Sequence, residues 1–289
     1  MDEGGVVLNP ILKYRGGKQR EIPEFIDQIP HNFQRYFEPF LGGGSVFFRL
    51  EPQQAVIGDV NEKLITFYTQ LRNQYSLMRE QLDALQRKYE ENQAAFEELK
   101  RLHPDERCEN RNEALYYSLR QQYNHPTGQY LDGVLYFFIN KTAYSGMLRF
   151  NSSGEYNVPF GRYRRFNTAV ISQEHSNLLQ RATVLHSDYR QLFAMAQPTD
   201  FMFLDPPYDC IFNDYGNIDM MDGFNEVTHR QLAADFRNLA CPALMVIGAT
   251  PLTEELYAPF IQGRYEKRYA VNIRNRFQSA ATHMIVKNY

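Results

Sequence analysis

Short apolar runs recur along this chain, and segments with helical periodicity lie between them. The runs are residues 35–40, 55–58, 182–185, 201–204 and 243–247. Strands that alternate with helices form a mostly parallel sheet covered by helices, so this pattern predicts an α/β fold. Two later runs, residues 267–273 and 282–286, predict a strand pair that closes the sheet. Little sequence separates them, which predicts antiparallel pairing.

The second and third predicted strands are separated by about a hundred residues, which is far too long for a simple crossover. Residues 71–102 carry leucines and aromatic residues at helical spacing and predict an amphipathic helix or helical pair. An apolar run at residues 131–139 and a loop or hairpin at residues 140–154 follow, with Gly146 and Gly154 as turn residues. We therefore expect an inserted domain at residues 67–167, and a main domain formed by residues 1–66 and 168–289.

Composition excludes several classes of protein. The 289 residues are 43% hydrophobic and 22% charged, and no apolar run reaches the roughly 18 residues of a membrane span. The N-terminus lacks the pattern of a signal peptide, so we expect an intracellular, cytoplasmic protein without membrane contact. The three cysteines lie far apart and in no paired motif, which predicts neither a disulfide framework nor a metal site.

The charge pattern allows a local contact with a polyanion. A formal net charge of −3 argues against a protein that binds nucleic acid over its whole surface. Between Lys141 and Arg165, however, five basic residues stand against one acidic residue. This segment is where a polyanion could dock, although short basic clusters are equally common in solvated loops.

A glycine-rich turn follows the first predicted strand. Gly42, Gly43 and Gly44 come shortly after Phe40, and Asp59 ends the second strand 17 residues after Gly42. Such a turn lets a nucleotide approach the backbone, and an acid about 20 residues later binds ribose hydroxyls. The arrangement predicts an adenosine-containing cofactor, and it leaves open whether that cofactor is a dinucleotide.

The sequence Asp205-Pro206-Pro207-Tyr208 closes the fourth predicted strand at the same edge of the sheet. The carboxylate of Asp205 and the carbonyl of Pro206 offer two acceptors to an exocyclic amino group, and the two prolines fix the turn. Tyr208 offers a flat face on which a base taken out of a duplex can stack. An Asp-Pro-Pro turn elsewhere is an ordinary stiff turn, but the preceding strand and the glycine turn favour a functional site.

Six motifs occur in the order seen in Dam-like, alpha-group DNA adenine methyltransferases, and the chain resembles that family from Asn9 to Tyr289. The motifs are residues 13–18, 40–44, 59–61, 140–151, 156–163 and 205–208. The resemblance implies a Rossmann-like methyltransferase sheet with an inserted, mainly helical DNA-recognition domain that carries a hairpin loop. It also implies S-adenosylmethionine as methyl donor, S-adenosylhomocysteine as product, and the 6-amino group of a flipped adenine in double-stranded DNA as acceptor. Nothing familiar occurs in residues 70–113.

The resemblance further implies roles for individual residues. The catalytic turn is Asp205, Pro206, Pro207 and Tyr208. The cofactor site is formed by Tyr14, Lys18, Phe40, Gly42, Gly44, Asp59, Asp188 and Asp205. The DNA contacts are Lys13, Lys141, Tyr144, Ser145, Met147, Arg149 and Asn151. Asp188 is explained equally well as a helix cap.

Arg149 is the natural reader of guanine in the major groove, with Lys13 as second candidate, and a phosphate contact is the alternative for Arg149. Family members that methylate adenine in GATC commonly carry Asn where this chain has Ser145 and Leu where it has Met147. GATC is therefore one candidate sequence and not a commitment.

The expected mechanism is direct methyl transfer without a covalent enzyme intermediate, a metal or a cysteine nucleophile. A ribosomal-RNA adenine methyltransferase and a catalytically silent DNA-binding protein stay open as alternatives. A nicotinamide oxidoreductase shares the glycine turn and the acid but has no use for residues 205–208. The sequence shows no dimer signature, so a monomer is expected, and it does not reveal whether a restriction endonuclease is a partner.

Overall fold

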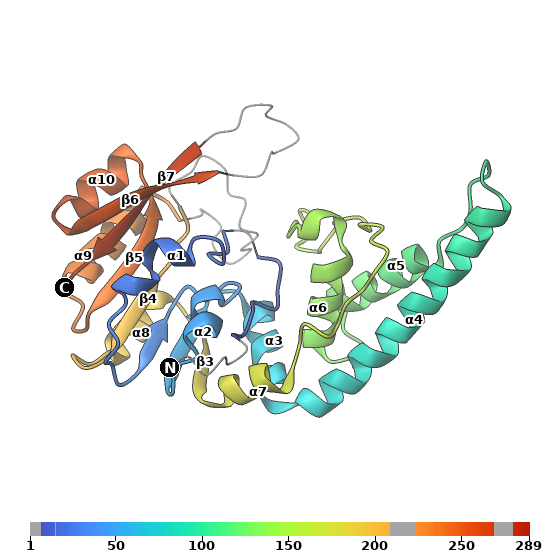
Figure 1. Ribbon diagram of the computed structural model, residues 1–289, viewed down its shortest axis with the longest axis horizontal. Helices are drawn as coiled ribbons and strands as arrows, with labels where there is room; N and C mark the ends of the chain where they lie inside the picture. Colours follow the sequence, from blue (N-terminus) through green and yellow to red (C-terminus); the bar gives the residue numbers. More distant parts are fainter. Residues whose placement is uncertain (1–6, 15, 209–223, 269–279) are drawn as a thin grey trace. The chain divides into compact units, whose positions relative to one another are not determined.

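The computed structural model describes residues 7–14, 16–208, 224–268 and 280–289 (Figure 1). The chain divides into two compact units. Unit 1 comprises Met1–Arg15 and Asn61–Gln180, and unit 2 comprises Gly16–Val60 and Arg181–Tyr289. That catalysis and DNA recognition belong to separate domains stays a prediction, because these units are defined by packing alone.

Within its described residues, unit 2 forms a seven-stranded sheet with the order β3-β2-β1-β4-β5-β7-β6. The strands are β1 (Tyr36–Glu38), β2 (Ala55–Asp59), β3 (Ala182–His186), β4 (Phe201–Leu204), β5 (Ala243–Gly248), β6 (Ile261–Arg268) and β7 (Ala280–Lys287). The first five are parallel, and β7 pairs antiparallel with both β5 and β6. The predicted α/β class and the antiparallel closing pair are thus confirmed.

The sixth strand begins earlier than the sequence pattern predicted. It starts at Ile261, not at residue 267, and residues 269–273 lie outside the described part of the chain. Residues 261–266 are largely polar and carry Gly263, so they give no strand pattern of their own. Pairing with the apolar strand β7, across an irregularity between Ile261 and Gly263, makes them a strand.

The order of the strands creates a topological switch. From β1 the chain moves outward to β2 and β3, and it later returns to add β4 and β5 on the other side of β1. Neighbouring parallel strands β1 and β4 therefore have connections that leave in opposite directions. Open α/β sheets bind ligands at this point, outside the carboxyl ends of the strands.

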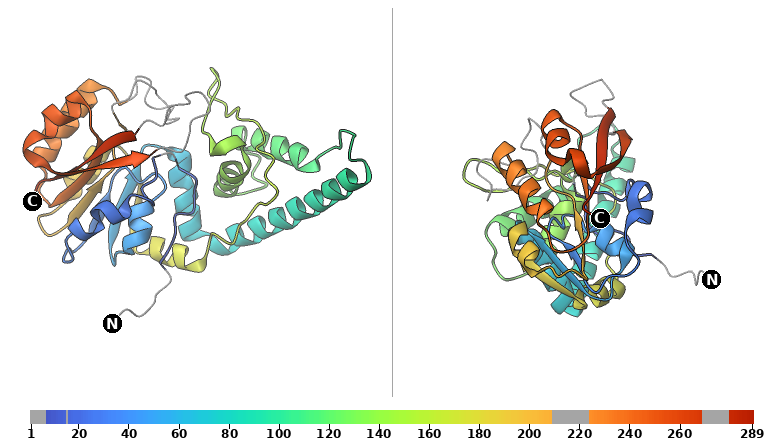
Figure 2. Two further views of the ribbon diagram at one scale, coloured as in Figure 1. Left: turned by 45° about the horizontal axis from the view of Figure 1, so that its top comes forward. Right: turned by 90° about the vertical axis from the view of Figure 1, so that its left-hand side faces the viewer.

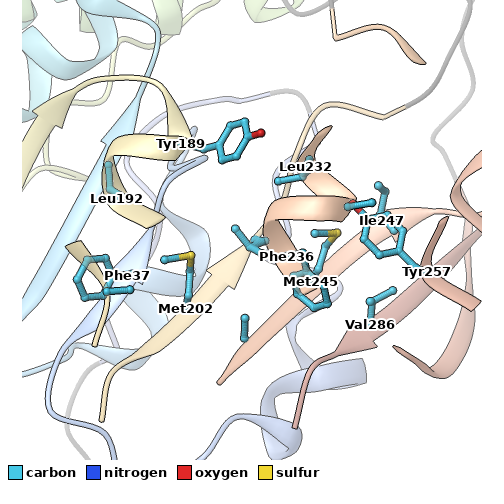
Figure 3. Close-up of a cluster of buried hydrophobic side chains, with 14 of the residues drawn as sticks. Phe37, Tyr189, Leu192, Met202, Leu232, Phe236, Met245, Ile247, Tyr257 and Val286 are labelled. Carbon is cyan, nitrogen blue, oxygen red and sulfur yellow. The ribbon is translucent and has the colours of Figure 1, made fainter. Parts of the chain in front are cut away.

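Helices cover both faces of this sheet. One face packs against α8 (Tyr189–Met195), α9 (Glu226–Arg237) and α10 (Pro251–Tyr257), which is followed by a 3₁₀ turn at Ala258–Phe260. Alternate strand residues such as Phe37, Met202 and Met245 point into this core (Figure 3). The other face carries α1 (Ile22–Phe25), a 3₁₀ turn at Ile26–Gln28 and α2 (Ser45–Leu50). There Phe25 stacks on Phe203 of β4 with ring centroids 5.3 Å apart.

Unit 1 is mainly helical in its described residues. Its helices are α3 (Glu62–Asn73), α4 (Tyr75–Leu102), α5 (Arg111–Asn124), α6 (Asp132–Thr142) and α7 (Gln173–Gln180). Of the two forms predicted for residues 71–102, an amphipathic helix or a helical pair, the structure shows mainly one long helix, α4 (Figure 2), and only residues 71–73 belong to α3, which ends before Gln74. The apolar run at residues 131–139 is helix α6, which packs on α3 and α5 and is buried along most of its length.

The segment after α6 has the predicted hairpin character but no regular strands. A 3₁₀ turn covers Tyr144–Gly146, and isolated antiparallel bridges join Ala143 to Phe160 and Phe150 to Tyr156. Gly154 turns the chain with a φ of 77°, a conformation that glycine adopts without steric cost. In the described ranges, no helix combines the length and apolarity needed to cross a bilayer.

Candidate functional site

The glycine turn and the Asp205-Pro206-Pro207-Tyr208 turn leave neighbouring strands at the switch point. Tyr36 of β1 pairs with Phe201 of β4, so both strands end at the same edge of the sheet. The residues that follow are the glycine turn after β1 and residues 205–208 after β4. The sheet thus brings together two motifs that lie far apart in the sequence.

The glycine turn is fastened to the end of β2. Gly42 and Gly44 have φ values of 47° and 66°, which only glycine adopts readily. The amide of Gly42 donates to Oδ2 of Asp59 at 2.9 Å, and the amide of Leu41 donates to the carbonyl of Gly58 at 2.9 Å. Asp59 is 7% exposed. Its carboxylate therefore shapes the turn, whatever it binds in addition.

Ser187 is a candidate that the sequence analysis did not single out. It follows β3, and its amide donates to the carbonyl of Asp59 at 3.1 Å. Its hydroxyl oxygen is buried and has no hydrogen-bond partner among the described residues. A buried hydroxyl without a partner costs about 1–3 kcal/mol, so such a group at the carboxyl edge of the sheet is a candidate ligand contact. A serine before an aspartate gives no distinctive signal in the sequence.

Lys18 and Asp205 form a close ion pair. The ammonium of Lys18 lies 2.7 Å from each carboxylate oxygen of Asp205 and also donates to the carbonyl of Gly16 at 2.8 Å. Lys18 is 2% exposed and the Asp205 side chain 21%. Burial raises the pKa of Asp205 above its usual range, and the charge and hydrogen bond of Lys18 oppose that rise. Lys18, predicted to line the cofactor site, thus contacts the predicted catalytic carboxylate.

Glu38 is another buried acid at this edge, and the sequence analysis did not single it out. It ends β1, accepts a hydrogen bond from the hydroxyl of Tyr36 at 2.8 Å, and accepts another from the amide of Phe47 at 3.1 Å. Burial raises its pKa to about 8, and the nearby charges of Asp205 and Asp59 add to that rise. Glu38 is therefore protonated at neutral pH. Its position directly before the glycine turn was the available signal.

Tyr208 is held between neighbouring groups. Its ring meets the ring of His283 edge-on, with centroids 5.0 Å apart, and the ammonium of Lys18 lies 5.0 Å from its centroid. A Cβ atom added at Gly248 would lie 3.5 Å from Cδ2 of Tyr208, so the ring packs against the end of β5. Pro206 is buried and Pro207 half-buried in the same turn.

Phe40 and Asp188 lie on the helix side of this edge. Phe40 is half-buried, stacks on Tyr189 with centroids 5.6 Å apart, and meets the edge of Phe224. Asp188 caps α8, because its Oδ1 accepts from the amide of Arg190 at 3.0 Å, and it pairs with the Arg190 guanidinium at 2.7 Å. The capping alternative is thus present in the structure, and a contact of Asp188 with the cofactor adenine stays a prediction.

Unit 1 holds the N-terminal segment through a buried amide. Asn140 of α6 accepts from the amide of Lys13 at 2.9 Å and donates to the carbonyl of Lys13 at 2.8 Å. The ammonium of Lys13 lies 4.2 Å from the ring centroid of Tyr163. Asn140 therefore fixes the backbone of the second predicted base reader. Tyr14, also in unit 1, keeps its cofactor role as a prediction.

The predicted DNA contacts fall into two groups within unit 1. Tyr144, Ser145 and Arg149 are exposed and Met147 is half-buried. Arg149 is held by Asn157, with its Nε donating to Oδ1 at 2.8 Å.

The other two predicted DNA contacts, Lys141 and Asn151, form hydrogen bonds within unit 1. Lys141 donates to the carbonyl of Ile11 at 2.5 Å, and burial together with Lys13 lowers its pKa to about 8. Asn151 is exposed but fastens the hairpin turn, because its Oδ1 accepts from the amides of Ser153 and Glu155. Their DNA contacts stay predictions.

The sequence of this chain is similar to those of known proteins. Residues 14–273 match the family model described as D12 class N6 adenine-specific DNA methyltransferase. The type II methyltransferase M.CviBI of Paramecium bursaria Chlorella virus NC1A is 32% identical over 98% of this chain and its own full length. The type II methyltransferase M.MjaIII of Methanocaldococcus jannaschii is 30% identical over 80% of each chain. The DNA adenine methylase of Salmonella typhi is 27% identical over 93% of this chain and 88% of its own.

Proposed function

The chain belongs to the D12 class N6 adenine-specific DNA methyltransferases, and from that premise we propose which of its residues bind the methyl donor and which hold the adenine. The protein is an enzyme that methylates adenine in DNA. One observation carries the assignment of its site. The glycine turn after β1 and the Asp205-Pro206-Pro207-Tyr208 turn after β4 meet at the topological switch of the sheet.

S-adenosylmethionine is the proposed donor, and the residues at this edge fit it. Gly42 and Gly44 adopt left-handed backbone conformations and carry no side chains. The backbone of the turn can therefore pack closely against a cofactor. Asp59 and the buried hydroxyl of Ser187 offer an acceptor and a donor for the ribose hydroxyls. Phe40 adds an apolar surface. When bound, the donor supplies a methyl group on a positively charged sulfur, which is already activated for transfer.

Asp205 and Pro206 are proposed to hold the adenine. The carboxylate and the carbonyl accept the two N–H bonds of the amino group, while the ring of Tyr208 stacks on the flipped base. Lys18 orients the carboxylate and opposes the rise in the pKa of Asp205 that burial causes. The carboxylate would stabilise the positive charge that develops on the amino nitrogen as it takes the methyl group. The donor would leave as S-adenosylhomocysteine when its carbon–sulfur bond breaks, and the methylated amino group would release one proton to water. Positioning and this electrostatic contact supply most of the rate, and no covalent intermediate is needed.

DNA reading is proposed for unit 1, through Lys13, Tyr144, Ser145, Met147 and Arg149. Asn157 orients the guanidinium of Arg149, as bidentate reading of a guanine requires. An Arg149→Ala enzyme that loses discrimination at one base pair supports base reading. An equal loss of affinity on all sequences shows a phosphate contact instead. GATC is the first sequence to test.

The first experiment incubates the purified protein with radiolabelled S-adenosylmethionine and either duplex DNA or bulk RNA, and then identifies the labelled nucleoside. We expect N6-methyl-2′-deoxyadenosine from DNA alone, and the Asp205→Ala variant should transfer no label even at saturating donor. Label in RNA would contradict the proposed substrate. Sedimentation of the enzyme with a short duplex tests the monomeric state that we propose. Protection of the methylated DNA from restriction endonucleases tests a restriction–modification role.

A further inference from the structure

Glu21 is a buried carboxylate that the proposed methyl transfer does not use. It precedes α1 and is 5% exposed. Its Oε1 accepts from the ammonium of Lys267 at 2.5 Å, and its Oε2 accepts from the hydroxyl of Tyr265 at 2.7 Å. The same Oε2 lies 2.7 Å from Nδ1 of His283. One side chain near the N-terminus thus joins the closing strands β6 and β7 at the site.

The charge of Glu21 fixes the imidazole of His283. Burial alone would raise the pKa of Glu21, but His283, Lys18, Lys267 and Tyr265 together lower it to about 2. Glu21 is therefore ionised and only accepts hydrogen bonds. It follows that Nδ1 of His283 carries the hydrogen and donates to Oε2, which sets both the tautomer and the orientation of the ring.

The fixed imidazole supports Tyr208. His283 is fully buried, and its ring meets the Tyr208 ring edge-on at an interplanar angle of 81°. A Cβ atom added at Gly248 would lie in ordinary contact with the same tyrosine ring. The energy of an edge-on contact depends on the orientation of both rings. Rotation of the imidazole would therefore change the preferred position of the Tyr208 ring.

Lys18 and Glu21 belong to one turn of the chain. The amides of Glu21 and Ile22 both donate to the carbonyl of Lys18, at 2.7 and 2.9 Å. This turn therefore presents an ammonium to Asp205 and a carboxylate to His283. Residues 18–21 therefore contact Asp205 directly and Tyr208 through His283, and these are the two side chains proposed to hold the adenine.

We propose that Glu21 and His283 are positioning residues of the methyl-transfer site, which fix the ring of Tyr208 in the orientation that receives the flipped adenine. This inference rests on the proposed function, in which Tyr208 stacks on the target base. Neither residue touches the reacting atoms in this scheme. Their effect is on how the base is held and not on donor binding.

The test compares Glu21→Gln and His283→Asn with a matched control. Glu21→Gln keeps the shape of the side chain and removes its charge, while His283→Asn keeps a donor near the Nδ1 position and removes the ring. The control is Asp200→Asn, because Asp200 is also a buried acid of unit 2, 2% exposed and paired with Arg35 at 2.6 Å. It directly precedes β4 and so lies at the opposite end of that strand from Asp205.

Three quantities are measured for each enzyme: the single-turnover methylation rate, the dissociation constant of S-adenosylmethionine, and the fluorescence of 2-aminopurine at the target position of a bound duplex. For both site variants we expect a methylation rate about tenfold lower and a smaller fluorescence rise. The reason is that a misplaced Tyr208 ring holds the flipped adenine poorly for methyl transfer. Donor binding should stay within about twofold of wild type. Asp200→Asn should lose thermal stability and keep both the rate and the fluorescence rise.

Two failures are distinguishable. If the wild-type enzyme transfers no label to DNA or shows no fluorescence rise, the proposed function itself is wrong. If the wild type behaves as expected and the site variants match Asp200→Asn, Glu21 and His283 only stabilise the fold and the positioning role is wrong. Should His283→Asn fail to fold, Glu21→Gln decides the question by the same readouts, since it preserves volume and an acceptor oxygen.

Discussion

The ammonium of Lys18 lies 2.7 Å from both carboxylate oxygens of Asp205, although the two residues are far apart in the sequence. Because Lys18 is almost fully buried, the pair is poorly screened by solvent. Removing one partner of such a pair leaves a charge without compensation, which is more damaging than losing a surface ion pair. The lysine therefore affects both the fold and the protonation of the proposed catalytic acid.

Lys18→Met is expected to move the acid limb of the methylation rate profile to higher pH. Lys18 lowers the pKa of Asp205 against the effect of burial, so its loss lets that pKa rise further. In the variant, Asp205 is protonated and inactive at a pH where the wild-type enzyme is still active. We expect the acid limb of the rate profile to move by about one pH unit or more. Rates measured from pH 5 to 9 check this. Lys63→Met, which removes an ammonium bonded to the carbonyl of Tyr123, should leave the profile in place.

Glu38→Gln is expected to stabilise the protein at alkaline pH. The folded state keeps the Glu38 proton up to a pH of about 8, whereas the unfolded chain releases it near 4.5. The folded state thus binds more protons between these values, and the free energy of unfolding falls there by about 1.4 kcal/mol per pH unit. Glutamine removes this dependence and keeps an oxygen for Tyr36 and Phe47. Urea unfolding at pH 5 and pH 9 measures it, and an equal loss of stability at both values would contradict the assignment.

Asn140→Asp is expected to weaken the choice of target sequence. An ionised aspartate can accept from the amide of Lys13 but cannot donate to its carbonyl, so one of the two buried bonds is lost. The loss should cost about 1–3 kcal/mol and loosen the backbone of Lys13. Methylation of the mapped site is compared with that of sites changed at one base pair. Asn124→Asp, whose amide binds the backbone of Tyr156, is the control that should lower stability alone.

Ser145→Asn is expected to stabilise the loop after α6. Ser145 has a φ of 56°, in the left-handed region that asparagine enters more readily than most residues. Relief of this strain is worth a few tenths of a kcal/mol up to about 1 kcal/mol. Thermal unfolding checks the gain. Ser145→Ala keeps the strained backbone without a polar side chain, so a similar gain there would show that φ is not the cause.

The parts of the proposed site that sequence analysis predicted lie in short motifs. Residues 40–44, Asp59 and residues 205–208 each sit at the end of a strand, and strand ends can be located from apolar runs. Glu21, Lys267 and His283 lie in no motif and meet only because β6 and β7 fold back beside α1. Such contacts depend on packing between distant segments, which periodicity does not encode. The protonated state of Glu38 was missed for a related reason, since it follows from burial and not from residue type.

The switch between β1 and β4 also sets the order in which the molecule can be built. Phe201 is synthesised long after Tyr36, so β1 cannot pair with β4 until that part of the chain has been made. The strands β5 and β7 are synthesised later still. The continuous stretch Asn61–Gln180 of unit 1 leaves the ribosome complete while unit 2 still lacks most of its sheet. Pairings between distant strands carry a high loop-closure cost and form slowly. The nascent strands β1 and β2 therefore stay without their partners β4 and β3 while unit 1 is being synthesised.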